Sequence, residues 1–375
     1  MPAPSGLQPE NRVNTSPSFS THAPDLTRAQ AVPLAATRAV PVVLLWAIAG
    51  MVVLAFQLYV LGKWVTGPNF VPTDPGPDPI SNGKLMYFRF LEIAITLGAV
   101  ACMIKWLVLP WIREGRMTAD GRLFAAGAMI FFWDMSMNYS STALFYNSHF
   151  INYGAWNLGS WPGWMSPAAN LLPEPIFVTI PGYTALVTTQ AIFVCWLLRK
   201  AKDRWPQMGV LSTLGLIVLG CATVDTLIEI ALLRMDIYAY PGAIRSITLF
   251  AGETYQFPLN EGILFGGLGV GSMAALHYFR DDKGQTFVER GIDKLRYGQT
   301  GKQFLRGFAV FGYCHVMFFT LYTVPMQWFS LKSDPYPEGY PSYLVNGMCV
   351  YGINGDQCPG PGVMMPRIDA PSLEH

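Results

Sequence analysis

The sequence predicts an all-α fold: a polytopic membrane bundle of about seven transmembrane helices, with the N-terminus inside and the C-terminus outside. Of the 375 residues, 51% are hydrophobic and only 13% are Asp, Glu, Lys or Arg. A soluble domain carries roughly 25% of such charged residues, about twice as many. Apolar segments of roughly 20 residues, the length that crosses a bilayer, recur along the chain. This composition excludes a nucleic-acid-binding protein, a disordered protein and an ordinary soluble enzyme.

The predicted elements follow one another in three regions. Residues 1–39 are rich in Ser, Thr, Pro and Ala without apolar periodicity, which predicts a disordered N-terminal arm. Residues 40–331 form the transmembrane domain, and residues 332–375 form an extracytoplasmic C-terminal tail. The membrane helices are expected at about 40–62, 86–111, 122–145, 176–199, 208–233, 257–279 and 305–330. The stretch 243–256 is a candidate for one more short helix at the interface or dipping into the bundle.

The positive charges in the connections predict the orientation. The N-terminal arm and the connections after the second, fourth and sixth segments hold 17 Lys and Arg residues, whereas the opposite side holds six. Positive charge marks the cytoplasmic side, so we expect a multi-pass protein of the bacterial cytoplasmic membrane. Cys349 and Cys358 then lie outside the cytoplasm, where either a disulfide or two free thiols are compatible with the sequence.

Polar side chains inside the predicted helices point to a site. An ionisable group within a membrane segment is costly and is a functional hypothesis by default. Nearly all of these groups fall in the outer half of the predicted helices, which predicts a polar cavity that opens outward or lies sealed beneath the outer loops. The main polar side chains there are Arg89, Glu92, Asp134, Asn138, Asp225, Glu229, Glu261 and His315.

Two carboxyl groups share one face of the predicted fifth helix. Asp225 and Glu229 are four residues apart, so their Cβ atoms lie roughly 5–6 Å from each other. In a low dielectric the two cannot both ionise cheaply, which gives one proton donor and one acceptor. We therefore assign Asp225, Glu229 and Asp134 as candidate catalytic residues. A structural ion pair with Arg89 is the alternative for the first two, and Arg89 with Glu92 is expected to form a structural ion pair.

The connection between the third and fourth segments is aromatic and lacks charged residues. One interpretation is an interfacial belt. The other is a lid that covers an apolar substrate and hydrogen-bonds it through Asn and His side chains. The candidate substrate-binding residues, here and on the helices, are Asn138, Tyr146, Asn147, His149, Asn152, Tyr153, Trp156, Trp164, Glu261 and His315. No HxxxH or HxxE spacing occurs, so neither a metal nor another cofactor is expected.

Three short motifs carry a family resemblance. They are Phe-Tyr-Asn-Ser-His-Phe-Ile-Asn-Tyr-Gly-Ala-Trp at 145–156, Trp-Pro-Gly-Trp at 161–164 and Pro-Glu-Pro at 173–175. Together they resemble the AveC-like spirocyclase family, membrane proteins related to the avermectin-pathway spirocyclase that occur widely in actinobacteria. The resemblance covers roughly residues 80–335 and depends mainly on residues 130–175. It brings no set of catalytic residues with it, so the site residues above come from the polar pattern alone.

The resemblance implies a reaction that suits this polar pattern. A lipophilic, polyketide-like dihydroxy-ketone would close to a hemiketal, lose water to an oxocarbenium ion and be trapped by its second hydroxyl. This spiroketal-type cyclisation, and related dehydrations, need an acid, a base and a dry apolar pocket. The expected partners are therefore a lipophilic small molecule and the lipid bilayer, and not a nucleic acid; the oligomeric state stays open.

Other functions remain open at this point. A membrane terpenoid cyclase would also need a carboxylic acid in an aromatic pocket. A non-catalytic transporter or lipid-binding protein would change flux or binding, but no bonds, when Asp225 is replaced by Asn. A membrane oxidoreductase would require a bound metal or haem.

Overall fold

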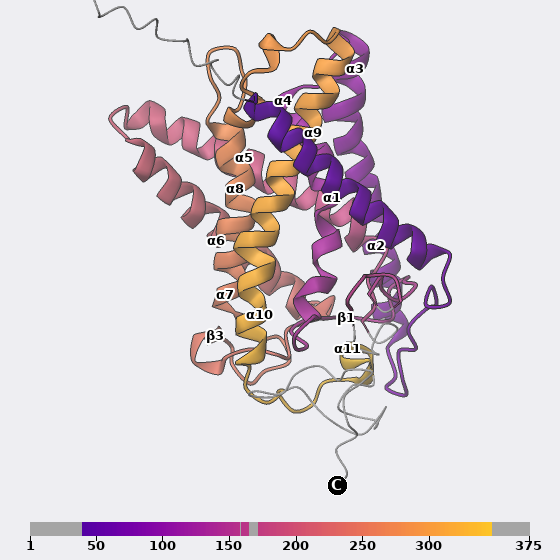
Figure 1. Ribbon diagram of the computed structural model, residues 1–375. Helices are drawn as coiled ribbons and strands as arrows, with labels where there is room; N and C mark the ends of the chain where they lie inside the picture. The colour runs from indigo at the N-terminus through magenta and orange to yellow at the C-terminus, as the bar shows by residue number, and fades with distance from the viewer. Residues whose placement is uncertain (1–39, 158, 165–171, 347–375) are drawn as a thin grey trace, which may run out of the picture. The chain divides into compact units, whose positions relative to one another are not determined.

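The computed structural model describes residues 40–157, 159–164 and 172–346 (Figure 1). The predicted arm (1–39), most of the predicted tail and the pair Cys349 and Cys358 lie outside the described residues. Within the described ranges, six helices are long and apolar enough to cross a membrane. These six spans are Val42–Val65, Asn82–Glu114, Val178–Arg204, Val210–Arg234, Leu259–Tyr278 and Gln299–Leu331. They mark the chain as a mostly helical membrane protein, as the sequence predicts, while its orientation stays a prediction.

Several of these spans combine an α-helix with a π-helical segment. The longer helical elements, in chain order, are α1 (Val42–Val65), α2 (Asn82–Met103), η1 (Ile104–Val108), α3 (Leu109–Glu114), α4 (Ala119–Gly127), η5 (Val178–Tyr183), α5 (Thr184–Arg204), α6 (Val210–Arg234), η7 (Gly262–Val270), α8 (Gly271–Tyr278), α9 (Gln299–Phe318), η10 (Phe319–Thr323) and α10 (Val324–Leu331). The short turns are η2 (Ile130–Trp133), η3 (Met135–Asn138), η6 (Arg245–Ile247), α7 (Leu259–Glu261), η8 (Phe287–Glu289), η9 (Ile292–Lys294) and α11 (Ser342–Val345).

Two pairs of very short antiparallel strands lie in the connections. Strand β1 (Phe145–Tyr146) pairs with β2 (Tyr238–Ala239), and β3 (Thr248–Leu249) pairs with β4 (Phe257–Pro258). The stretch 243–256 therefore holds the short turn η6 and strand β3, and the predicted interfacial helix there is wrong.

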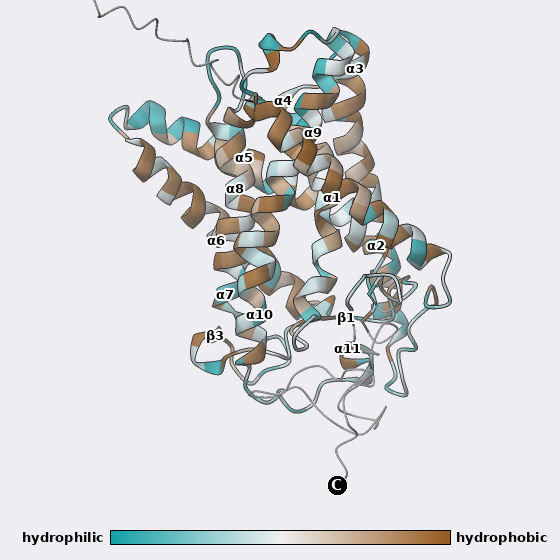
Figure 2. Ribbon diagram, viewed as in Figure 1, coloured by the Kyte–Doolittle hydropathy of each residue, from teal (hydrophilic) through white to brown (hydrophobic). Residues whose placement is uncertain are grey.

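The hydropathy of the chain follows this architecture. Figure 2 shows hydrophobic residues along the helices and hydrophilic residues gathered in connections such as the one between α5 and α6. Many large apolar side chains of the six spans are exposed, including Leu97, Leu211, Leu219 and Leu227. In water such surfaces would be unfavourable, and in a bilayer they face lipid.

The predicted third membrane helix over 122–145 is wrong as one continuous helix. Helix α4 ends at Gly127, and two short turns, η2 and η3, continue the segment. The segment runs parallel to α9 and α10, because the Ala126 carbonyl lies 3.2 Å from Nε2 of His315 and the Ser140 N–H donates to Gln327 at 3.1 Å. Non-helical backbone is tolerated at membrane depth where protein surrounds it, and residues 130–138 are buried.

Helices α1 and α9 cross at two glycines. A Cβ added to Gly50 would lie 2.2 Å from the Phe308 carbonyl oxygen, and one added to Gly312 would lie 2.3 Å from the Trp46 carbonyl oxygen. Both approaches are shorter than real Cβ contacts, so only glycine allows this backbone-to-backbone packing. Small residues at such crossings are the usual means of close helix association in membranes.

The substitution Gly312→Val is expected to lower the free energy of unfolding by about 1–3 kcal/mol, the cost of overpacking. The valine would force α1 and α9 apart along the longest shared interface of α1. The control is Gly307→Val on the same helix, where an added Cβ meets no atom within 4 Å. Unfolding of the purified proteins in one detergent measures the difference, and equal stability of both variants would contradict the close-packing argument.

Candidate functional site

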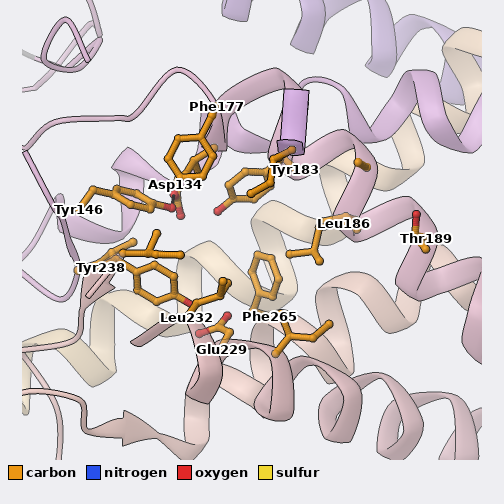
Figure 3. A pocket seen from close by; sticks show the side chains of 18 of the residues that line it. Asp134, Tyr146, Phe177, Tyr183, Leu186, Thr189, Glu229, Leu232, Tyr238 and Phe265 are labelled. Carbon is orange, nitrogen blue, oxygen red and sulfur yellow. Dashed lines mark hydrogen bonds between the residues drawn. The ribbon is translucent and has the colours of Figure 1, made fainter. Parts of the chain in front are cut away.

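A cavity of about 390 Å³ lies among α2, η5–α5, α6, η7 and η10, next to the β1–β2 pair. Most of its lining is apolar, with side chains such as Phe177, Leu186, Leu232 and Phe265. Three carboxyl groups and five tyrosines also line it, and these are Asp134, Glu229, Glu261, Tyr146, Tyr183, Tyr238, Tyr240 and Tyr322. In Figure 3, Asp134 and Glu229 point into the same space from above and below.

Asp134 lies at the junction of the two short turns η2 and η3. The Tyr146 hydroxyl donates a hydrogen bond to its Oδ2 at 2.5 Å, and Tyr183 of η5 also interacts with this carboxyl group. The aspartate is only 2% exposed. Because α4 ends before it, Asp134 does not follow the helix path, and its carboxyl group faces the cavity.

Glu229 lies near the end of α6 and is 7% exposed. The Tyr240 hydroxyl donates to its Oε2 at 2.8 Å, and the Tyr238 hydroxyl also interacts with it. Residues two apart on a strand point to the same side, so the sequence Tyr238-Ala239-Tyr240 aims both hydroxyls at one carboxyl group.

The small β1–β2 pair joins these two carboxyl sites. Tyr146 lies directly opposite Tyr238 in the register, and their ring centroids are 5.7 Å apart. One tyrosine binds Asp134 and the other contacts Glu229. The two acids therefore share a rigid base of cross-strand aromatic rings, which fixes their relative position.

Glu261 provides the third carboxyl group of the cavity. It lies in α7, where the chain enters the span Leu259–Tyr278. The Tyr322 hydroxyl donates to its Oε1 at 2.8 Å, and its Oε2 has no hydrogen-bond partner among the described residues. A buried carboxylate oxygen without a partner is costly, so this oxygen is available to a proton or to a ligand hydroxyl.

The charge balance of the cavity is one-sided. Its lining residues include no Lys, Arg or His within the part of the chain that the structure describes. The three carboxyl groups therefore face the cavity without a basic side chain among its described lining residues. Within the same ranges, no group of three or more His, Cys, Asp and Glu residues has an arrangement that could hold a metal ion.

The profile of the family described as "Spirocyclase AveC-like" matches residues 114–345, more than half of the chain. The chain belongs to the AveC-like spirocyclase family. The family resemblance predicted from the sequence is thereby confirmed. A search of curated proteins found no match, and neither did a search of solved structures.

The region that matches the AveC-like family contains all the acids and tyrosines of the cavity. It also contains Asp225, which the sequence placed with Glu229 in the catalytic set. Asp225 is buried one helical turn before Glu229 but does not line the cavity. It packs against Gly266, where an added Cβ would lie 2.4 Å from the Cβ of Asp225. The structure thus places this carboxyl group behind the cavity wall.

Glu174, in the Pro-Glu-Pro motif, was given no role by the sequence. Its side chain is 1% exposed and interacts with the carboxyl group of Asp134. Burial raises the pKa of Glu174 well above its ordinary value, and the negative charge of Asp134 adds to this shift. The flanking prolines were the available signal, because they restrict the backbone and thereby fix the direction of a side chain.

The structure does not bring His315 to the cavity. This residue is fully buried between α4, η2 and α1, and its Nδ1 accepts from Trp133 Nε1 at 2.9 Å and lies 3.2 Å from Gln57 Nε2. Its Nε2 lies against the Ala126 carbonyl. A histidine whose two ring nitrogens are both occupied by protein groups holds the broken segment in place and has no nitrogen left for substrate.

Three predicted substrate-binding asparagines bind backbone instead. Asn138 caps the turn before β1 by bonding the backbone of Ala143 and Leu144. Asn147 bonds the His149 N–H and the Asp236 carbonyl. Asn152 bonds four backbone groups, including the Thr73 N–H. None of the three lines the cavity.

Arg89 and Glu92 form an ion pair at 2.5 Å that anchors the aromatic connection to α2. Arg89 also donates to the His149 carbonyl at 2.6 Å, and Glu92 accepts the Ile151 N–H at 2.7 Å. The His149 ring lies beside Tyr343, away from the cavity. Burial lowers the pKa of His149, and the nearby positive charges of Arg89 and Lys84 lower it further.

The aromatic connection is packed against the protein and does not form a lid over this cavity. Tyr153 stacks on Phe70, Trp156 is buried and donates to the Phe132 carbonyl, and Trp164 packs against Tyr139. Tyr146 is the member of the described stretch 146–157 that lines the cavity. The parts of the predicted lid at 158 and 165–167 lie outside the described residues.

Proposed function

We propose that this protein is a membrane-embedded cyclase that closes a spiroketal, or a related cyclic ether, from a lipophilic dihydroxy-ketone with loss of one water. The observation that carries the proposal is the pair of tyrosine-bound carboxyl groups, Asp134 and Glu229, facing one apolar cavity. The family of the chain supports a cyclase. The setting we propose is the bacterial cytoplasmic membrane, within a polyketide-type biosynthesis.

The chemistry of the proposed reaction balances without a redox partner. One substrate hydroxyl adds to the ketone and gives a hemiketal, which is an isomer of the starting material. A carboxylic acid then protonates the hemiketal hydroxyl, the carbon–oxygen bond breaks and water leaves. The second hydroxyl attacks the resulting oxocarbenium ion, and a carboxylate takes its proton. Substrate gives product plus one water, and the pair of acids holds the same number of protons before and after.

Asp134 and Glu229 suit these two roles because they face one substrate volume from different elements. Either can give the proton to the leaving water while the other takes the proton of the attacking hydroxyl, since both face the same cavity. The tyrosine hydroxyls hold each carboxyl group in one orientation and donate to its charged form. Placing preorganised charge next to a developing cation is the largest single source of stabilisation in many enzymes.

The remainder of the cavity suits a lipophilic substrate. Its volume of about 390 Å³ falls in the ordinary range of small-molecule pockets, about 300–1,000 Å³. Phe177 and Phe265 present aromatic rings to a cation formed in the cavity. An apolar, water-poor pocket folds the chain for ring closure and prevents water from trapping the oxocarbenium ion.

The test is mass spectrometry on membranes that contain the full chain, incubated with a panel of lipophilic dihydroxy-ketones. We expect loss of one water from at least one compound with the wild-type protein and no loss with the double variant Asp134→Asn/Glu229→Gln. The control is Glu253→Gln, which neutralises an exposed carboxyl group outside the cavity and should retain activity.

The other outcomes of this test have distinct meanings. Water loss that persists in the double variant would contradict the assignment of these two acids. A product of unchanged mass but altered retention would show that the protein closes the hemiketal without removing water, which would contradict the proposed loss of water. Retention of an unchanged compound by the purified protein would indicate the non-catalytic binding function instead.

A further inference from the structure

We infer that the substrate enters this cavity sideways from the hydrocarbon core of the bilayer, through a mouth between α2, α5 and α6. The substrate class that follows is an amphiphile that dissolves in lipid and presents its oxygenated end to the carboxyl groups. The inference concerns the same cavity and therefore rests on the proposed function, but it predicts a route that can be measured without turnover.

The exposure of the lining residues locates the mouth. The carboxyl groups and all five tyrosines of the cavity are buried. The lining residues that retain exposed surface all belong to three of the candidate membrane spans, on α2, on η5–α5 and on α6. Gly98 of α2 and Thr189 of α5 are the most exposed of them. In Figure 3, Thr189 lies on the side of the cavity away from Tyr146 and Tyr238.

The height of the mouth places it in the hydrocarbon region. Gly98 is the middle residue of the 33-residue span Asn82–Glu114, and Thr189 lies two residues from the middle of Val178–Arg204. The hydrocarbon core is about 30 Å thick, which about 20 helical residues cross. The middle of such a long helix therefore faces acyl chains and not headgroups or water.

The end of the cavity near the connections is closed. Tyr146, Tyr238 and Tyr240 cover it, and each is at most 7% exposed. Tyr146 and Tyr238 belong to the β1–β2 pair, and the Asn346 side chain donates a hydrogen bond to the Tyr146 carbonyl at 3.4 Å. Among the described residues, this closed end leaves the mouth between α2, α5 and α6 as the route into the cavity.

The mouth is built of small and apolar residues. Gly98 leaves its opening unobstructed, because a Cβ added there meets no atom within 4 Å. Around it lie Ile95, Ala185, Leu186 and Ile228, which match the polarity of lipid chains. A polar substrate would lose hydration along this path, whereas the apolar part of an amphiphile would lose nothing.

The test uses the full chain reconstituted in phosphatidylcholine vesicles and a long-chain fatty alcohol that carries an alkyl diazirine near its hydroxyl end. Light converts the diazirine to a carbene, which inserts into nearby O–H bonds, and peptide mass spectrometry locates the tag. In the wild type we expect tags on Asp134, Glu229 or their tyrosines. In Gly98→Phe we expect these tags to fall about tenfold, which corresponds to a barrier to entry higher by about 1.4 kcal/mol.

Two further variants, one at the mouth and one away from it, test whether the loss of tagging is specific to the mouth. Thr189→Phe narrows the same mouth from α5 and should also reduce tagging. Gly215→Phe adds the same ring on the lipid face of α6, where an added Cβ meets no atom within 4 Å, and should leave tagging unchanged. An absence of cavity tags in the wild type would overturn the inference. So would unchanged cavity tags in both mouth variants, or equal tagging by a short water-soluble diazirine alcohol.

The result of the tagging experiment can be distinguished from the result of the conversion experiment. The probe is not a substrate, so tagging reports the route alone. If the mouth variants block tagging while no dihydroxy-ketone is converted, the lateral route is supported and the proposed cyclisation is contradicted. If the wild type converts a dihydroxy-ketone and the mouth variants convert it as fast, the proposed cyclisation is supported and the lateral route is contradicted.

Discussion

Replacing Glu229 with Gln is expected to lower the rate of water loss by a factor of about 10²–10⁴, the contribution of a positioned general acid or base. The amide keeps the shape of the side chain and can still accept from the Tyr240 hydroxyl, so the cavity should keep its form. It can neither give nor take the proton that ring closure moves. Initial rates at saturating substrate, followed by mass spectrometry on equal amounts of folded protein, measure the effect.

Asp225→Asn is the matched control on the same helix. Asp225 is also buried, but it lies behind the cavity wall against Gly266, so its amide variant should lose much less activity than Glu229→Gln. A result in the opposite order would show that Asp225 is the proton-transferring residue. The acid–base pair would then be Asp225 and Glu229, as their four-residue spacing in the sequence predicts.

Hydropathy predicted most of the fold because six of the segments meet lipid. A segment with a lipid-facing side must satisfy its backbone hydrogen bonds internally and be helical. The segment 122–145 contains an apolar run over 123–133, but it lies inside the protein, where the side chains of Asn138 and Gln327 bond its backbone. Composition does not distinguish lipid from protein surroundings, so the break after Gly127 was not predictable from it.

The carboxyl groups of the cavity were easier to predict from the sequence than the tyrosines that hydrogen-bond them. Asp134, Glu229 and Glu261 stand out because an acid in an apolar segment is rare and costly. Tyr183 and Tyr322 do not stand out, since tyrosine is ordinary at membrane interfaces. The asparagines of the aromatic connection were predicted as ligands, although Asn side chains commonly bond nearby backbone, as Asn152 does with Ser148 and Gly154.

Away from the cavity, a buried charge cluster joins α4, η8 and α9. The carboxyl group of Glu289 is fully buried and pairs with Arg306 at 2.5 Å and with Arg122 at 3.2 Å. Its other oxygen accepts from the Thr286 N–H and hydroxyl, each at 2.8 Å. Burial lowers the pKa of Arg122 to about 10, so at neutral pH this guanidinium is still charged and requires a counter-charge.

Glu289→Gln is expected to lower the free energy of unfolding by about 3–5 kcal/mol, because breaking a buried pair leaves an uncompensated charge. Here the Arg122 guanidinium, 4% exposed, would remain without a carboxylate. Asp293→Asn is the control, since Asp293 pairs with Lys283 at 3.6 Å while both are more than half exposed, and such pairs contribute about 0–1 kcal/mol. Denaturant titration of both purified variants in one detergent compares them. Equal loss of stability in the two would mean that Glu289 is dispensable to the packing of α4 against α9.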